Sequence, residues 1–354
     1  MVDGICQYCY YPYLTISTAE ELRQISLDGK YILLNNIDLG GIEWTPIGTY
    51  ANPFTGIFNG NGYEISNFKI TTDVQYIGLF GCNTGTIQKL GVKNYTIKVV
   101  SSCEDSIAAG GLVGYNNRGI IEKCYTTGTV NVTHNITGYI SDVGGLVGNN
   151  YDGTITESYA TGNVTAKAWR ADTGGLVGDS YGLISNCFAT GNVNNTRNLY
   201  PASGGLVGYG GDSVINCYAL GDVISILQRT TSHDGYGSCS WAGGLIGYYT
   251  GGKNIKYCYA TGNIQSTSYA SEDSSYGGGL IGDSGSSYIY GWYRYSGQKI
   301  TLSAKNYTYE HNSGTTATDM ATLKSISFHT NTLGWDSTTW NFIEGQHPTL
   351  KNTN

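Results

Sequence analysis

Gly110-Gly111-Leu112-Val113-Gly114 is repeated five more times along this chain. The later copies begin at Gly144, Gly174, Gly204, Gly243 and Gly278, at intervals of 30 to 39 residues. Most copies are followed by a second phrase of the type Cys-Tyr-Ala-Thr-Gly, which begins at Cys124, Ser158, Cys187, Cys217 and Cys258. A fixed period of about 20–50 residues is the signature of a solenoid or a similar array. The sequence therefore predicts a stack of similar turns, whose function lies in columns of side chains rather than in one pocket.

The repeat predicts three short strands per turn. The first lies in the Leu-Val of the double-glycine phrase, the second includes the apolar residue three positions before the Cys slot, and the third begins after the Thr-Gly turn. Because every repeat is wound in the same sense, equivalent strands pair in parallel at ~4.8 Å, and parallel crossovers are almost always right-handed. The predicted fold class is all-β, a right-handed parallel β-helix (solenoid) with an interior leucine column formed by Leu112, Leu146, Leu176, Leu206, Leu245 and Leu280.

The two ends of the chain differ from its middle, as the ends of a solenoid must. We expect a short capped helix at 18–22 and another at 318–324, with Trp335 and Trp340 as apolar cover near the C-terminus. We divide the single continuous solenoid domain into an N-terminal cap with entry turns, the β-helix repeats and a C-terminal cap, at 1–76, 77–291 and 292–354. Polar segments whose length varies between repeats are predicted to be loops, at 132–142, 227–240 and 265–276.

Composition restricts the class of protein and its partners. Charged residues make up only 13% of the chain, and it contains 52 Gly and 31 Tyr among 354 residues, which is typical of a β-rich extracellular or cell-surface protein. A net charge of −7 without a basic run excludes nucleic acid as a partner. No apolar stretch approaches ~18 residues, so we expect no membrane span. No signal peptide is visible in the first residues.

The cysteines are predicted to be free thiols. Four of the nine occupy one slot of the repeat, and Ser158 fills the same slot in another copy, so this slot selects a small, weakly polar side chain. Cys6 and Cys9 have the spacing of a metal or redox pair, but no second pair and no nearby His completes a zinc site. We therefore expect no metal and no cofactor.

At these motifs the chain resembles the GLUG-repeat family of bacterial and archaeal surface proteins, which includes repeat regions beside IgA-cleaving peptidases. Gly-Gly-Leu-Val-Gly and Cys-Tyr-Ala-Thr-Gly-Asn-Val carry the resemblance, and the segments at 16–62 and 333–350 are similar to the usual start and end of such modules. The resemblance implies the solenoid fold and a mostly non-catalytic role. Tyr11-Pro12-Tyr13-Leu14 is similar to the motif that ends a module, which indicates one unit of a tandem array or a unit that docks to its copy.

An aromatic column is the predicted binding surface. It contains Tyr125, Tyr159, Phe188, Tyr218 and Tyr259, one ring from each successive copy of the second phrase. If the neighbouring Cys and Ala face inward, alternation along the strand points these rings outward. Such a ladder can stack on sugar rings or contact a partner protein, or it can serve only to stabilise the sheet.

Two carboxylates suggest a different kind of site. Asp142 and Asp172 both lie two residues before the double glycine, and stacking would place them near the ~5–5.5 Å separation of a retaining glycosidase. The alternative is two solvated loop carboxylates, since Ala108 and Ala202 fill the slot in the neighbouring turns and no Arg or Lys is expected beside the pair. The zinc-helix pattern of a metallopeptidase is absent. We predict no catalytic residues.

These observations together favour a non-catalytic extracellular structural or adhesion module. A stiff β-solenoid offers many repeated contacts that add up, and its open ends invite pairing with further copies. The expected partners are therefore the chain itself, through self-assembly or incorporation into a surface filament, or a cell-surface glycan or protein. The alternative is a carbohydrate-binding or polysaccharide-cleaving β-helix (a lyase or glycoside hydrolase) that uses the acidic loop residues.

Overall fold

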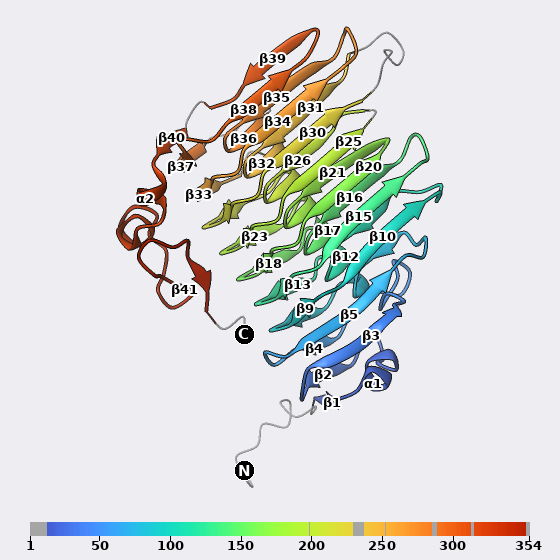
Figure 1. Cartoon of the computed structure of the whole chain (residues 1–354). Helices are drawn as coiled ribbons and strands as arrows, with labels where there is room; N and C mark the ends of the chain where they lie inside the picture. The colour runs from blue at the N-terminus through green and yellow to red at the C-terminus, as the bar shows by residue number, and fades with distance from the viewer. Residues whose placement is uncertain are drawn as a thin grey trace.

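Successive turns of the chain stack in parallel, and equivalent residues of the repeats lie opposite one another (Figure 1). The computed structural model describes residues 13–197, 199–228, 237–251, 253–284, 289–312 and 315–351. Val113 pairs with Val147, Val147 with Val177 and Val177 with Val207, so the register follows the sequence repeat without a slip. The predicted parallel β-solenoid is confirmed, whereas its right-handed sense stays a prediction.

Two sheets flank the double-glycine phrase, one before it and one after it in the chain. The eight-stranded sheet precedes the phrase and contains β6 (Tyr76–Ile77), β11 (Ile107–Ala109), β16 (Ile140–Gly144), β21 (Arg170–Gly174), β26 (Ala202–Gly204), β31 (Cys239–Gly243), β35 (Ser274–Gly278) and β39 (Tyr307–Glu310). The seven-stranded sheet begins within the phrase and contains β7 (Phe80–Asn83), β12 (Val113–Asn117), β17 (Val147–Tyr151), β22 (Val177–Ser180), β27 (Val207–Gly210), β32 (Ile246–Tyr249) and β36 (Ile281–Ser284).

The remaining parallel strands form one continuous 25-stranded sheet in three columns. The first column contains β1 (Leu14–Ile16), β2 (Lys30–Leu33), β4 (Ile57–Asn59), β8 (Thr86–Gln88), β13 (Ile120–Glu122), β18 (Thr154–Thr156), β23 (Leu183–Ser185), β28 (Val214–Ile215), β33 (Ile255–Ala260), β37 (Ile289–Tyr295) and β40 (Thr315–Thr318). The second contains β9 (Gly91–Lys93), β14 (Tyr125–Thr126), β19 (Tyr159–Ala160), β24 (Phe188–Ala189) and β29 (Tyr218–Ala219). The third contains β3 (Ile37–Glu43), β5 (Glu64–Ile70), β10 (Thr96–Ser101), β15 (Thr129–His134), β20 (Val164–Ala168), β25 (Val193–Arg197), β30 (Val223–Leu227), β34 (Ile264–Ser268) and β38 (Ile300–Ser303).

A complete middle turn therefore has five short strands, not the three that we predicted. The Tyr-Ala of the second phrase forms its own strand, and the polar residues before the double glycine form another. The predicted loops at 132–142, 227–240 and 265–276 are consequently wrong in part, because β16, β31 and β35 begin inside them. Their inward polar side chains bond to one another, as Ser240 and Ser266 do through their hydroxyls at 2.9 Å.

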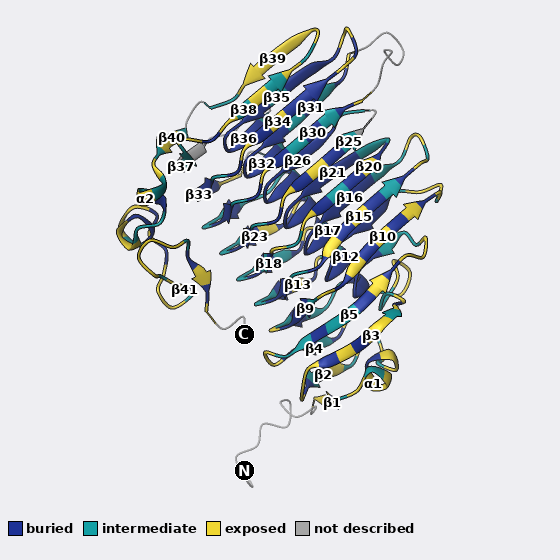
Figure 2. Cartoon of the chain, viewed as in Figure 1, coloured by how far each residue is buried: buried dark blue, intermediate teal, exposed yellow. Residues whose placement is uncertain are grey.

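The interior contains an apolar core that continues from turn to turn, and its residues are buried (Figure 2). Every residue of the predicted leucine column is fully buried. The double glycine allows the backbones to approach closely at the corner. A Cβ on Gly144 would lie 2.0 Å from the Val147 carbonyl oxygen, and a Cβ on Gly145 would lie 2.3 Å from that of Gly175. Any larger residue at either position would force the turns apart.

The Cys slot behaves as predicted. The seven cysteines in the described part of the chain are free thiols. Cys187 and Cys217 each donate from Sγ to the carbonyl oxygen two residues earlier, at 3.1 Å, and the Ser158 hydroxyl makes the same bond at 2.8 Å. Trp292 takes the slot in the last turn, and its indole N–H donates to the Ile255 carbonyl at 2.8 Å. Cys6 and Cys9 lie outside the described residues.

Short helices lie near both ends, as predicted. α1 (Ala19–Arg23) is capped by Thr18 and Glu21 in a reciprocal capping box. α2 (Met320–Leu323) is capped by Asp319 and is followed by a π-helical turn, η1 (Phe328–Thr332), and by a small antiparallel pair, β41 (Trp340–Asn341) and β42 (Thr349–Leu350). Parallel strands continue across the predicted boundaries near 77 and 292. No helix in the described residues is long and apolar enough to cross a membrane.

Candidate binding surfaces

The predicted aromatic column forms a stacked ladder. Tyr125, Tyr159, Phe188, Tyr218 and Tyr259 lie in register in consecutive turns. Their ring centroids are separated by 4.6 to 5.0 Å, and adjacent ring planes differ by no more than 5°. The ladder arises because one aromatic slot recurs at the spacing of parallel strands. It lies outside the leucine core, as the alternation of side chains predicts.

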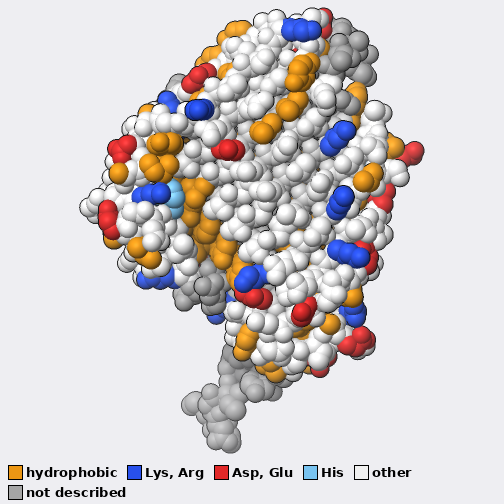
Figure 3. All heavy atoms as spheres, viewed as in Figure 1, with side chains coloured by type: hydrophobic (Ala, Val, Ile, Leu, Met, Phe, Trp, Pro, Cys, Tyr) orange, Lys and Arg blue, Asp and Glu red, His pale blue; other side chains and the backbone are white. Residues whose placement is uncertain are grey.

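Most of the ladder is covered by the C-terminal segment, residues 319–351. In Figure 1 this segment lies beside the middle turns instead of closing the end of the stack, and Figure 3 shows hydrophobic side chains and a histidine where the two parts meet. The Tyr218 hydroxyl donates to the Pro348 carbonyl at 2.6 Å, and the Tyr259 hydroxyl is 3.0 Å from His347 Nδ1. Trp335 stacks on Tyr259 at 5.9 Å.

The C-terminal segment of the same chain therefore covers part of the ladder. Phe188, Tyr218 and Tyr259 are buried, Tyr125 is buried and bonded to Glu64, and Tyr159 is half-buried. Trp335 and Trp340 supply the predicted apolar cover, but they supply it at the side of the solenoid rather than across its end. Binding of an external ligand by these five rings stays a prediction.

A second surface lies at the double-glycine corner. One row of outward side chains lies two residues before each double glycine, and another follows directly after each phrase. The first row is Tyr76, Ala108, Asp142, Asp172, Ala202, Trp241, Tyr276 and Tyr309. The second row is Cys82, Tyr115, Asn149, Asp179, Tyr209, Tyr248 and Asp283. We name these two rows the inner corner.

The side chains of the two rows converge on the outer side of the turn. Asn149 Nδ2 donates to Asp142 Oδ2 at 2.7 Å, although six residues separate the two along the chain. The rings of Trp241 and Tyr248 have centroids 4.4 Å apart. The side chains of the two rows therefore contact one another along the corner.

Acidic residues form the centre of the inner corner. Asp142 and Asp172 pair directly across β16 and β21, and Asn149 and Asp179 pair across β17 and β22. Two expectations from the sequence are therefore corrected. Both aspartates of the first pair lie on strands and are buried, rather than in solvated loops, and a basic residue does accompany them. Arg170 Nη2 is 3.5 Å from Asp172 Oδ2.

Arg170 could have been found from the sequence. It lies two residues before Asp172, so once that segment is a strand both side chains point to the same face. The assignment of the segment as a loop hid this relationship. The Arg170 guanidinium also lies 5.6 Å from the centre of the Tyr209 ring, and this contact holds it beside the carboxylates.

The surroundings of the centre favour the neutral form of one carboxyl group. Burial raises the pKa of Asp179 well above its usual value, and the nearby carboxylates of Asp142 and Asp172 raise it further, while Arg170 opposes them. A protonated carboxyl can donate a hydrogen bond as well as accept one. No group of three or more His, Cys, Asp or Glu residues in the described chain is arranged to hold a metal ion. The carboxyl groups and the guanidinium of the centre are hydrogen-bonding groups.

Aromatic residues flank this centre on both sides. Towards the N-terminus, Tyr76 stacks between Tyr50 and Tyr115 at 6.0 and 5.5 Å. Towards the C-terminus, Trp241 stacks on Tyr200 at 5.7 Å, and its ring packs at a tilt against that of Tyr248. Burial raises the pKa of Tyr76 and of Tyr115 to about 12, so both phenols stay protonated at ordinary pH.

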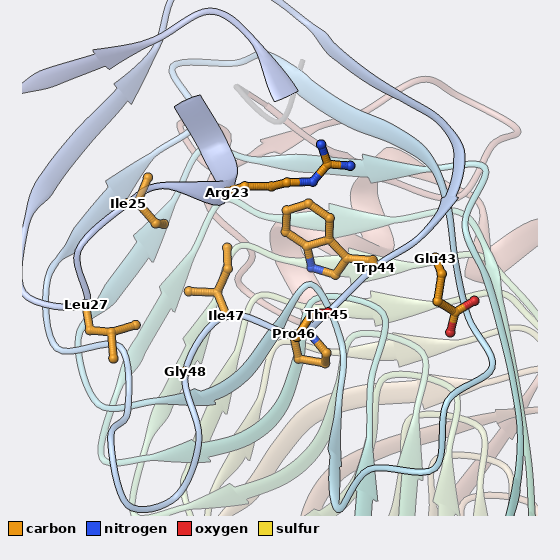
Figure 4. Close-up of a pocket in the computed structure, with 9 residues that line it drawn as sticks. All are labelled: Arg23, Ile25, Leu27, Glu43, Trp44, Thr45, Pro46, Ile47 and Gly48. Carbon is orange, nitrogen blue, oxygen red and sulfur yellow. The ribbon is translucent and has the colours of Figure 1, made fainter. Parts of the chain in front are cut away.

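Two hollows lie at the N-terminal end and share part of one wall. The first, of about 380 Å³, lies below α1, where Arg23 lies over the indole of Trp44 while the Glu43 carboxylate points away (Figure 4). Glu43 accepts hydrogen bonds from Thr71 and Thr72. The second hollow, of about 410 Å³, is lined by Tyr50 and Tyr76 and therefore opens at the end of the inner corner. Residues Thr45, Pro46 and Gly48 border both hollows.

Comparison with known families identifies the repeat. The model of the GLUG motif matches residues 105–131, 140–165, 200–224 and 240–265, which confirms the predicted resemblance. A crystal structure described as a "putative immunoglobulin A1 protease" from Bacteroides ovatus superimposes with a TM-score of 0.59, covering 96% of this chain and 92% of that one. The two sequences are 20% identical, so this likeness concerns the fold alone.

Two curated relatives match part of the chain. A "Putative Gly-rich membrane protein" of Evansella cellulosilytica is 38% identical over 124 residues, which make up 32% of this chain and 14% of that protein. "Halomucin" of Haloquadratum walsbyi is 32% identical over 128 residues, which make up 32% of this chain and 1% of that protein. The chain therefore spans a small fraction of the length of either relative.

Proposed function

We propose that this chain is a non-catalytic structural module of an extracellular or cell-surface protein, a stiff shaft that carries repeated contact surfaces. The observation that carries the proposal is the unbroken parallel register of the repeats from β6 to β39. GLUG motifs and the β-solenoid fit a surface structural module, and the names of both relatives describe membrane or mucin-like proteins. Labelling of intact source cells with an antibody to the chain tests the location, and labelling only after lysis would contradict it.

Self-assembly is the finer part of this proposal. The last strand of the eight-stranded sheet, β39, is exposed along its whole length and pairs on one side only, with β35. An exposed sheet edge is a template for pairing with another chain. We expect concentrated protein to form end-to-end oligomers, visible as short rods in negative-stain electron microscopy. A proline in the middle of this edge (Thr308→Pro) should shorten the rods, whereas monomers at all concentrations would argue against assembly.

A polysaccharide-cleaving enzyme is the second candidate, and one observation favours it. Burial and the neighbouring carboxylates of Asp142 and Asp172 raise the pKa of Asp179, and a carboxylic acid with a raised pKa near a carboxylate is the arrangement of glycosidases. Release of reducing ends from a polysaccharide panel tests this function. Activity that is lost in both Asp172→Asn and Asp179→Asn would establish an enzyme, and no release by the unaltered protein would remove the candidate.

A further inference from the structure

The two ends of the solenoid are finished differently. At the N-terminal end, α1 packs on the first turns and buries Leu22 fully. At the C-terminal end, β38, β39 and β40 are the last strands of their columns, and in the described chain each pairs with a single neighbour. The C-terminal segment lies against the aromatic ladder instead of over these strands (Figure 1). The C-terminal end therefore presents an open sheet edge.

The outer edge of β39 is accessible to another strand. All four of its residues are exposed (Figure 2), and its side chains include two tyrosines, Tyr307 and Tyr309, that are 51% and 39% exposed. On its inner side β39 pairs in parallel with β35. Because alternate residues of a strand direct their N–H and C=O groups to opposite sides, the outer side retains backbone groups that a further strand can bond.

The N-terminal end of a second copy cannot supply that strand. At that end β6 is the first strand of the same sheet, and β3 already pairs with β5 in the column beside it. Since β38 and β39 follow one another in one turn, as β5 and β6 do, a β39 strand placed on β6 would bring its own β38 into the position of β3. The geometry therefore excludes pairing of β39 with β6.

The sequence of β39 is complementary to itself. Tyr307-Thr308-Tyr309 reads the same in both directions. When two copies pair in antiparallel fashion about Thr308, each Tyr307 lies opposite the partner's Tyr309, and the two threonines lie opposite each other. Aromatic pairs and Thr–Thr pairs both stabilise paired strands. On the other face Asn306 lies opposite the partner's Glu310, and an amide can donate to a carboxylate.

We propose that two copies of this chain associate through their C-terminal ends, with β39 of each copy pairing antiparallel about Thr308. The inference rests on the self-assembly proposed above and names its partner, which is the C-terminal end of a second copy. A twofold contact uses the same surface on both copies and is closed, so this assembly ends at a dimer. The short rods expected of concentrated protein are then two modules long.

A single introduced cysteine tests which ends meet. Thr308→Cys places a thiol on the twofold axis, where the two Cα atoms of an antiparallel pair lie ~4.5–5.5 Å apart, within the range of a disulfide. Mild oxidation of the concentrated whole chain should give a linked dimer on a non-reducing gel. Thr301→Cys is the control, because Thr301 is exposed at the same end but lies on β38, and it should give no such dimer. The parent protein controls for the native cysteines.

The tyrosines test the register of the contact. Tyr307→Ser and Tyr309→Ser should each raise the dissociation constant of the dimer roughly tenfold in sedimentation velocity, because by symmetry each removes two aromatic pairs. Tyr269→Ser is the matched control, since this ring is 49% exposed and lies outside β39, and it should leave the dissociation constant unchanged. All variants should keep the circular dichroism spectrum of the parent protein.

The outcomes separate this contact from self-assembly in general. A dimer that Thr308→Cys links and that both tyrosine variants weaken supports the proposal. Rods longer than two modules that Thr308→Cys does not link would overturn the twofold contact and leave self-assembly standing. Monomers at every concentration up to millimolar, without a cross-link, would overturn both. Equal weakening by Tyr269→Ser would overturn the assigned register.

Discussion

At the scale of single residues, a buried asparagine column connects the turns. Asn83 Nδ2 donates to Asn116 Oδ1 and Asn116 Nδ2 donates to Asn150 Oδ1, each at 2.8 Å, and Asn150 continues to the Ser180 hydroxyl at 3.2 Å. Asn116 also donates to the Gly119 carbonyl at 3.0 Å, which closes the turn that follows β12. Each amide therefore satisfies a backbone group in its own turn and an amide in a neighbouring turn.

Asn116→Ala should destabilise the protein by about 2–3 kcal/mol, because it leaves buried partners unsatisfied on both sides. The measurement is the free energy of unfolding from urea titration. Asn131→Ala is the control, since Asn131 is exposed on β15, and it should change the stability by less than about 0.5 kcal/mol. Equal effects of the two substitutions would show that the column does not connect the turns.

At the scale of elements, the C-terminal segment is held to the ladder by neutral histidines. The pKa values of His329 and His347 are both lowered to about 4, chiefly by burial and, for His347, also by Lys324 and His329. The Ser325 carbonyl and Glu344 act in the opposite direction on His329, and Tyr259 faces His347. Because the pKa of each is lower in the folded than in the unfolded chain, the unfolded chain binds protons more readily.

The docking of this segment should therefore weaken as the pH falls from about 6.5 towards 4, and it should be unaffected above about 7. Trp335 and Trp340 lie in the contact, so their fluorescence emission should move to longer wavelength over this range. His329→Gln combined with His347→Gln should remove most of the pH dependence. An emission maximum in the parent protein that stays constant down to pH 4 would contradict this account of the segment.

The sequence predicted the side-chain columns that repeat and the short capped helices, and it missed the long-range contacts that do not repeat. The leucine column, the cysteine slot and the aromatic ladder recur at a fixed spacing, so each could be located before any coordinates were known. The docking of Trp335 and Trp340 on the side of the solenoid is a single long-range contact, and a single contact leaves no period. Arg170 was missed for a second reason, since a polar strand was predicted to be a loop and its alternation was not applied.

At the scale of the whole molecule, the account depends on turns that lie on one another in register. The proposed structural role needs this arrangement, because turns stacked in register make the shaft stiff. The third column of the large sheet allows the distance between turns to be measured directly. Lys98 on β10 and Gln265 on β34 are exposed and are connected through Asn131, Thr165, Asn194 and Ile224, five steps of the register.

The most direct measurement is the distance between two spin labels placed at positions 98 and 265, through non-natural amino acids that spare the native cysteines. Pulsed electron paramagnetic resonance should give one narrow distribution centred near five steps of ~4.8 Å, about 24 Å between the labelled backbone positions. A broad distribution, or a mean far longer than this, would show that the turns do not stack in register and would contradict the account.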